Sequence, residues 1–230
     1  MCSSTLSNGS PTKLVGAPRS ELSFFQERHV VFTVSTLKEM PAPRIETPRL
    51  LLRHWCQEDR EPFAQMNSNS EVMRYFPQAL DRIQSDLFAE VIQIGLEERD
   101  HGLWAVELRN DRSLAPAPFI GFVGLSVPTW NASFTPCTEI GWRLNRPFWG
   151  RGFATEAARH VLRYGFQVLK LNEVVSFTSL LNARSMAVME RLGMTSDVTE
   201  NFDHPKIETN NELCRHALYR IGDKEWAHSN

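Results

Sequence analysis

Cysteine is scarce in this chain. The 230 residues include only four cysteines, none of them in a Cys-x-x-Cys spacing: Cys2, Cys56, Cys137 and Cys214. The seven histidines form no cluster with metal-ligand spacing either. This pattern argues against a disulfide-stapled secreted scaffold and against a structural zinc site. We therefore expect reduced thiols, no metal and a cytoplasmic location.

The chain also lacks a long apolar run and a surplus of basic charge. No apolar segment reaches the roughly 20 residues that a membrane-spanning helix needs. The formal net charge is −2, from 25 basic and 27 acidic side chains, which gives no general attraction to nucleic acid or to a membrane surface. We therefore expect neither nucleic acid nor membrane as a partner. We expect a monomer or a homodimer.

The first 40 residues differ in composition from the rest. Met1–Ser20 is rich in Ser, Thr, Gly and Pro, contains no acidic residue, and lacks the apolar core of a secretory signal. This composition predicts a flexible extension over residues 1–40, with a transit peptide as the alternative. We expect one folded domain over residues 41–224 and a C-terminal tail over 225–230.

The most informative stretch runs from Glu139 to Glu156. Its first six residues alternate between polar and apolar side chains, which is typical of a strand. Gly150 and Gly152 then give the backbone the freedom that a tight turn needs. From Ala154 onward, apolar residues recur every three or four positions, which predicts a helix over 153–170.

A turn of this kind favours anion binding. The first N–H groups of a helix have no partner inside the helix and carry partial positive charge, and Arg151 adds a full charge beside them. The stretch is not a nucleotide-hydrolase phosphate loop, because the chain has no Gly-Lys-Ser/Thr triplet. It is not a dinucleotide fingerprint, because Thr155 replaces the third Gly. A connection that is tight for structural reasons alone is the alternative.

The stretch resembles the pyrophosphate loop of the GCN5-related N-acetyltransferases (GNAT superfamily). Within that superfamily it is most similar to the branch of ribosomal-protein N-terminal acetyltransferases (RimJ/RimL-like), which has Trp-Gly-x-Gly-aromatic-Ala-Thr-Glu-Ala, here Trp149–Ala157. A second signature, Asn-x-x-Ser-x-x-x-x-Glu-x-x-Gly-Met, lies at Asn182–Met194, although Asn and Gly are also natural helix caps there. The opening Thr-x-Arg-Leu-x-Leu-Arg is similar too, at Thr47–Arg53.

The resemblance and the local patterns together imply an α/β (α+β) fold. We expect a mixed central sheet of about seven strands, splayed at the cofactor site and flanked by helices. Expected strands cover 45–53, 103–108, 119–127, 139–144, 173–179, 195–203 and 213–221. Expected helices cover 57–67, 70–77, 81–100, 153–170 and 182–194. Because a helix intervenes, the strand at 173–179 should lie parallel to that at 139–144.

The resemblance implies acetyl-coenzyme A as donor and a primary amine as acceptor, which attacks the thioester directly without an acyl-enzyme. An α-amine, with a pKa of ~7.7–8.0, is partly neutral near pH 7, whereas a lysine amine near ~10.4 rarely is. We therefore favour a protein or peptide N-terminus as acceptor. A small amine (polyamine, amino acid or antibiotic) and a catalytically idle coenzyme A-binding module are the alternatives.

The resemblance also assigns site residues. Glu139 is the candidate base, with a purely structural carboxylate as the alternative. Met189 stands where many relatives have a Tyr that protonates the leaving thiolate, so Ser185 is the candidate acid. The residues implied in cofactor binding are Trp142, Leu144, Trp149, Gly150, Arg151, Gly152, Phe153, Ala154, Thr155, Asn182 and Ser185.

Overall fold

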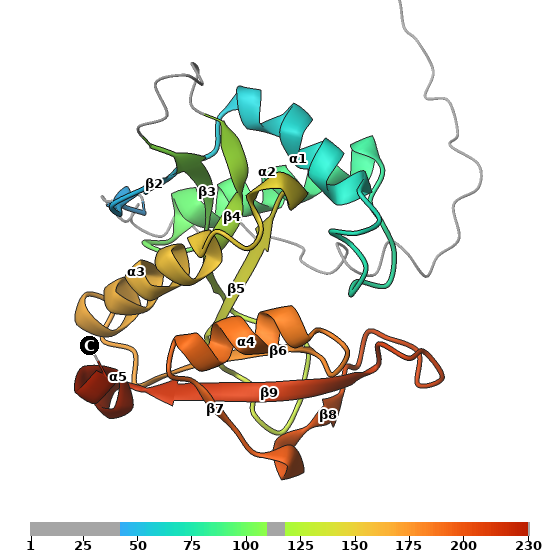
Figure 1. Cartoon of the computed structure of the whole chain (residues 1–230), viewed down its shortest axis with the longest axis vertical. Coiled ribbons are helices and arrows are strands. Elements are labelled where there is room, and N and C mark those ends of the chain that lie inside the picture. Colours follow the sequence, from blue (N-terminus) through green and yellow to red (C-terminus); the bar gives the residue numbers. More distant parts are fainter. Residues whose placement is uncertain (1–41, 110–117, 230) are drawn as a thin grey trace, which may run out of the picture. The chain divides into compact units, whose positions relative to one another are not determined.

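The computed structural model describes residues 42–109 and 118–229 (Figure 1). The chain divides into two units, Met1–Leu37 and Lys38–Asn230. The extension expected over residues 1–40 lies outside the described residues. Within the described ranges, no helix combines the length and the apolar character that crossing a membrane requires.

The centre of the second unit is one mixed sheet, as the predicted fold class requires. The order of its nine strands is β1-β2-β3-β4-β5-β6-β9-β7, with β8 also paired to β9. All pairs are antiparallel except β5 with β6, so the predicted parallel pair is confirmed. The strands are β1 Ile45–Glu46, β2 Leu50–Arg53, β3 Leu103–Leu108, β4 Phe119–Ser126, β5 Glu139–Leu144, β6 Glu173–Ser179, β7 Thr195–Ser196, β8 Phe202–Asp203 and β9 Arg215–Gly222.

The sheet has nine strands where about seven were expected, because two expected strands are each interrupted. Pro48 lies in the bend between β1 and β2, where its ring removes a backbone donor from the ladder. A 3-10 turn at Val198–Glu200 separates β7 from β8, and the Asp197 carboxylate accepts hydrogen bonds from Thr199 there. Both interruptions have local turn chemistry as their cause.

The helices are α1 Arg60–Ser68, α2 Arg82–Glu98, α3 Phe153–Gln167, α4 Ala183–Arg191 and α5 Asp223–Ser229. Asp81 caps α2 by accepting the Gln84 N–H, and Asn182 caps α4 by accepting the Ser185 N–H. The helix expected over 70–77 is wrong: the segment forms turns. The Asn69 side-chain oxygen accepts the Glu71 and Val72 N–H groups, and the Asn69 carbonyl accepts the Met73 N–H, so a single turn begins here and does not continue as a helix.

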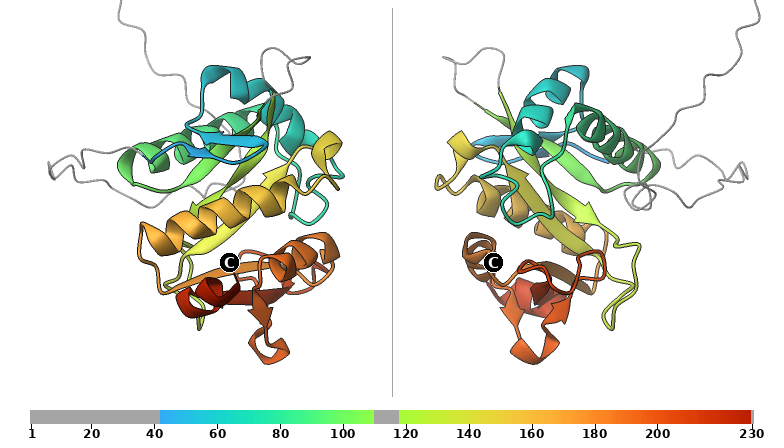
Figure 2. Two further views of the ribbon diagram at one scale, coloured as in Figure 1. Left: turned by 60° about the vertical axis from the view of Figure 1, so that its left-hand side comes forward. Right: turned by 90° about the vertical axis from the view of Figure 1, so that its right-hand side faces the viewer.

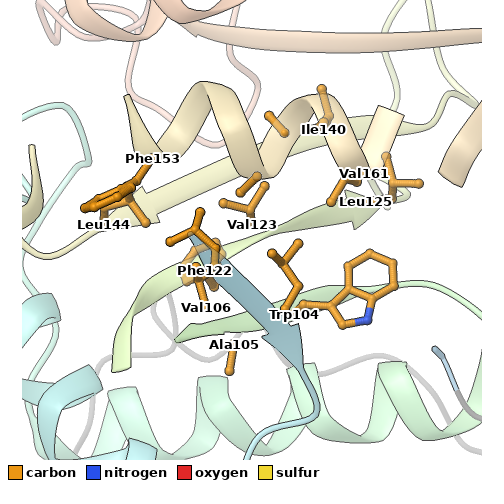
Figure 3. Close-up of a cluster of buried hydrophobic side chains, with 14 of the residues drawn as sticks. Trp104, Ala105, Val106, Phe122, Val123, Leu125, Ile140, Leu144, Phe153 and Val161 are labelled. Carbon is orange, nitrogen blue, oxygen red and sulfur yellow. The ribbon is translucent and has the colours of Figure 1, made fainter. Parts of the chain in front are cut away.

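Helices cover both faces of the sheet. Helix α3 lies across β4 and β5 on one face (Figure 2), and Leu125, Ile140 and Val161 belong to the core cluster there (Figure 3). Phe122, on the opposite face of β4, contacts Phe63 of α1 and Phe88 of α2 at ring-centroid distances of 6.1 Å each. Alternate residues of one strand therefore serve two separate halves of the core.

Helix α2 lies within the range 81–100 where a helix was expected, but four of its large apolar side chains, three or four positions apart, do not face the core. Ile83, Leu87, Val91 and Ile94 are 71%, 47%, 50% and 45% exposed. The contacts to the sheet side come instead from small and apolar residues on the other face of the helix: Ser85, Ala89, Ile92, Gly95 and Leu96.

Residues 225–230, expected as a tail, fall largely within helix α5. The Trp226 side chain is buried and stacks on Phe166 of α3, with ring centroids 5.8 Å apart. Helix α5 is therefore attached to the core through this tryptophan.

Candidate active site

Strands β5 and β6 are paired only where they begin. Glu139 is in register with Val175, whose N–H donates to the carbonyl of Thr138 at 2.9 Å. Beyond this point β5 stays paired with β4, and β6 stays paired with β9. Figure 1 shows β5 and β6 diverging. The facing backbone groups of the two strands are therefore not used for pairing with each other, which is the splay that the resemblance implies.

The turn after β5 leaves the N-terminus of α3 open. Gly150 and Gly152 have φ of 74° and 80°, which is the left-handed region that favours glycine. Gly152 is the N-cap residue, and no side chain caps the helix. A Cβ placed on Gly150 meets no atom within 4 Å. The uncapped N–H groups and the open surface above Gly150 suit a phosphate group.

A hydrogen-bonded clamp fixes this turn to the start of the domain. Glu156, in the first turn of α3, accepts the Thr47 hydroxyl at 2.6 Å and the Arg49 Nε at 2.6 Å. Arg49 also donates from Nη1 to the Arg151 carbonyl at 3.0 Å. Burial by itself raises the pKa of Glu156, but the hydrogen bonds from Thr47 and Arg49 outweigh it and lower the pKa. The opening motif and the Ala-Thr-Glu-Ala motif are thus two halves of one clamp.

Arginines surround the turn. The Arg146 and Arg184 guanidinium carbons lie 5.1 Å and 4.9 Å from the Trp149 ring centroid, and that of Arg151 lies 4.9 Å from the Phe153 ring. Arg184 belongs to the first turn of α4, so the two signature motifs meet at Trp149. Sequence reasoning missed Arg146 and Arg184, although both stand within or beside the motifs and their charge was a visible signal.

The expected cofactor residues do not all present free groups. The Trp149 indole N–H donates to the Leu144 carbonyl at 2.7 Å, so this carbonyl already has a partner. The Phe153 side chain is buried in the core (Figure 3), so only its backbone is left for contact with a ligand. Trp142 is partly buried against the core.

At the start of α4, Asn182 links the helix to β6. Its amide nitrogen donates to the Thr178 hydroxyl at 2.9 Å and to the Ser185 hydroxyl at 3.0 Å. Thr178, which sequence reasoning missed, thereby orients Asn182. Met189 is 1% exposed and belongs to the core. It therefore offers no polar group in place of the tyrosine that many relatives have at this position.

Glu139 lies where the strands separate. The Ser126 hydroxyl donates to its Oε2 at 3.3 Å. Burial raises the pKa of Glu139 to about 7, and the hydrogen bond from Ser126 acts in the opposite direction. A carboxyl group with this pKa exchanges a proton readily near neutral pH.

Aromatic side chains cluster at β6, on the sheet face that carries Glu139. Phe177 follows Val175 by two residues, and it therefore shares the face of Glu139. It contacts the Trp130 ring, with centroids 5.4 Å apart. The rings and imidazoles of this cluster are Trp130, Phe134, Phe177, Phe202, His204 and His216. Burial lowers the pKa of His204 to about 4, which leaves this imidazole neutral at pH 7.

Known proteins resemble this chain over most of its length. A family model described as "Acetyltransferase (GNAT) domain" matches residues 49–195. The chain is 32% identical to the FsC-acetyl coenzyme A-N(2)-transacetylase of Aspergillus fumigatus over 197 residues, which cover 80% of this chain and 78% of the relative. It is 28% identical to the uncharacterized N-acetyltransferase YnaD of Bacillus subtilis, covering 79% and 98%. A GNAT-family acetyltransferase structure from Bacillus anthracis superposes with a TM-score of 0.64 at 25% identity, covering 79% and 99%.

Proposed function

Because the chain belongs to the GNAT acetyltransferase family, we propose that it transfers the acetyl group of acetyl-coenzyme A to the N-terminal α-amine of a protein or peptide. Acetyl-coenzyme A-dependent N-acetyltransfer is the activity of the family, and the α-amine is our assignment of the acceptor. The observation that carries it is Glu139, a carboxyl with a pKa of about 7 at the point where β5 and β6 separate. Such a base suits an amine that is itself partly neutral near pH 7.

In the proposed mechanism, the chain orients two substrates and moves one proton. The uncapped start of α3 and the arginines around Trp149 hold the phosphates of the donor. The separated strands align the donor with the acceptor. The amine attacks the thioester carbonyl, and the Glu139 carboxylate takes the proton that the amine loses. Ser185, held by Asn182, donates a hydrogen bond to the departing thiolate, which is a tolerable leaving group because a thiol pKa is only about 8.5.

A small amine is the second candidate acceptor. The relative from Aspergillus fumigatus is named as an N(2)-transacetylase, a name that does not mention a protein N-terminus, which favours this alternative. A catalytically idle coenzyme A-binding module is the third reading. The absence of a tyrosine at Met189 favours it, and the basicity of Glu139 argues against it.

Turnover on matched acceptors tests the proposal. We would compare kcat/KM for short peptides with free N-termini, for the same peptides with a blocked N-terminus and one internal lysine, and for a panel of small amines. The expected result is acetylation of the free N-termini with mass spectrometry placing the acetyl group on the α-amine. Higher kcat/KM for small amines would replace the proposal with the second candidate. Binding of acetyl-coenzyme A without any turnover would favour the idle module.

A further inference from the structure

Arg143 is a buried charge on the same strand face as Glu139. The two residues stand four positions apart on β5, so their side chains leave the same face of the sheet. Arg143 is opposite Phe122 of β4, the residue that faces α1 and α2. The Arg143 residue is 9% exposed. It therefore lies beneath the surface on the face opposite α3.

The surroundings of this guanidinium are mostly apolar. Its carbon lies 4.1 Å from the Phe76 ring centroid, 5.4 Å from Phe122 and 5.9 Å from Phe88. Nη1 donates to the side-chain oxygen of Asn67 at 2.6 Å, whereas the buried Nε has no partner. Within the described ranges, no carboxylate forms an ion pair with Arg143. Burial lowers the pKa of Arg143 to about 9, so it remains cationic at pH 7.

An unneutralised buried charge is unfavourable for folding, and Arg143 nevertheless occupies the strand that carries the proposed base. Asn67 and the three rings orient the guanidinium, and they do not neutralise it. An anion reaching this position would gain a charge-assisted hydrogen bond in a largely apolar setting.

The strand surface between Glu139 and Arg143 is open. Gly141 is the residue between them on this face, and a Cβ placed there meets only Glu139 Oε1, at 3.9 Å, within 4 Å. Phe76, which lies over the guanidinium, is itself 37% exposed. The positions of Glu139 and Arg143 are about 13 Å apart along the strand, from a rise of ~3.3 Å per residue.

We propose that Arg143 binds a carboxylate of the acceptor, so that the enzyme prefers amines that carry an acidic group a short distance from the reacting nitrogen. This inference rests on the proposed role of Glu139 as the base that receives the amine. An extended peptide advances ~3.3–3.6 Å per residue, so its second and third residues lie ~3.5 and ~7 Å beyond the first, and an acidic side chain there together with the long side chain of Arg143 spans the remaining distance. A polyamine fits poorly, because it would bring a second ammonium group toward a buried cation.

Equilibrium binding of matched peptides tests the inference. Peptides with Glu at position 2 or 3, and their Gln counterparts, would be titrated by calorimetry into enzyme saturated with coenzyme A, which prevents turnover. The expected result is a Kd about tenfold lower for the Glu peptide than for the Gln peptide at one of the two positions. Arg143→Met should bring the ratio close to one, and Arg143→Lys should retain part of it.

The controls separate charge recognition from structural damage. Arg82→Met removes an exposed arginine of α2 that pairs with Glu61 and Asp86, and it should leave the ratio unchanged. Arg143→Met should fold, because an apolar residue of similar volume is often tolerated in place of a buried charge; its midpoint of thermal unfolding checks this. Equal binding of Glu and Gln peptides to the unaltered enzyme, or no peptide binding, would overturn the inference. A ratio that survives in Arg143→Met would do the same.

Turnover of the same peptides with acetyl-coenzyme A is a separate readout. Peptides that bind with the expected ratio but are not acetylated would refute the peptide N-terminus as acceptor and leave the anion preference of Arg143 intact. Peptides that are acetylated without regard to Glu or Gln would refute the anion preference and leave the proposed function intact.

Discussion

Burial shifts the pKa values of individual charged side chains in this protein. Glu139 and Arg143 stand on one strand, and burial shifts the pKa of both toward neutrality, upward for the acid and downward for the base. Glu156 is different, because hydrogen bonds from Thr47 and Arg49 lower its pKa in spite of burial. We assign chemistry to Glu139, recognition to Arg143 and a purely structural clamp to Glu156.

Replacing Glu139 by Gln should lower kcat about 10²- to 10⁴-fold, the usual contribution of a general base. In the unaltered enzyme the rate should rise with pH through about 7, because the base acts only in its deprotonated form. The variant should lose this rise, apart from the part that comes from deprotonation of the amine substrate. Steady-state rates from pH 5.5 to 9 measure both effects. A variant with an unchanged pH profile would show that Glu139 is not the base.

The same substitution should stabilise the fold above pH 7. The folded-state pKa of Glu139 is raised, so its contribution to stability falls as pH increases from the ordinary carboxyl range to about 7 and stays low above that. Glu139→Gln removes this penalty, on the order of 3 kcal/mol at pH 8, and changes little at pH 4. Urea unfolding at the two pH values measures it. An equal loss of stability at both would indicate that the carboxylate is needed for packing.

At the scale of secondary-structure elements, the start of α3 is held by contacts from the connection between β1 and β2, through Thr47 and Arg49. The turn with Gly150 and Gly152 has no side-chain cap of its own. Its position depends on the hydrogen bonds of Arg49 to Glu156 and to the Arg151 carbonyl. The N–H groups of this turn can therefore remain uncapped and available to a ligand, while the hydrogen bonds of Arg49 hold the turn in position.

Arg49→Met should weaken binding of acetyl-coenzyme A about five- to tenfold. The reason is that the turn loses a charge-assisted hydrogen bond that fixes its position, although all the groups that contact the donor are still present in the chain. Calorimetric Kd values report the change, and kcat at saturating donor should fall much less. Arg82→Met, which removes exposed ion pairs at the start of α2, should leave the Kd unaltered. An unchanged Kd for Arg49→Met would mean that the turn holds its shape without the clamp.

Helix α2 allows a second comparison at this scale. Leu96→Ala should destabilise the fold by about 2–5 kcal/mol because Leu96 is fully buried. Leu87→Ala removes the same atoms from a side chain that is 47% exposed, and it should change the free energy of unfolding by less than about 1 kcal/mol. Urea denaturation measures both. A large loss of stability for Leu87→Ala would show that the exposed apolar surface of α2, formed by Ile83, Leu87, Val91 and Ile94, is covered in solution.

At the scale of the whole molecule, the proposed donor site joins segments from distant parts of the chain. Acetyl-coenzyme A at about 100 times its Kd should add ~2.7 kcal/mol of stability, which is roughly 5–11 °C in the unfolding midpoint of a domain of this size. Acetyl-pantetheine lacks the pyrophosphate and should give a smaller rise at equal concentration. Scanning calorimetry compares the two. Equal shifts would mean that the turn at Gly150 contributes nothing to binding.

The sequence by itself determined the features that depend on neighbouring residues. The strand at 139–144, the glycine turn, the start of α3 and the Asn182 cap were all predictable, because caps, turns and periodicity act over a few residues. The family motifs added the mixed fold and the donor. The parallel pairing of β5 and β6 followed from the helix between them.

Tertiary structure alone decided which side chains meet. The pairing of Glu156 with Thr47 and Arg49 joins residues more than 100 positions apart, and local patterns contain no information on such contacts. The exposure of Leu87 and its neighbours, the burial of Arg143 beneath Phe76, and the raised pKa of Glu139 have the same origin. Each depends on how much water the rest of the fold removes from a side chain, and only the packed structure determines that.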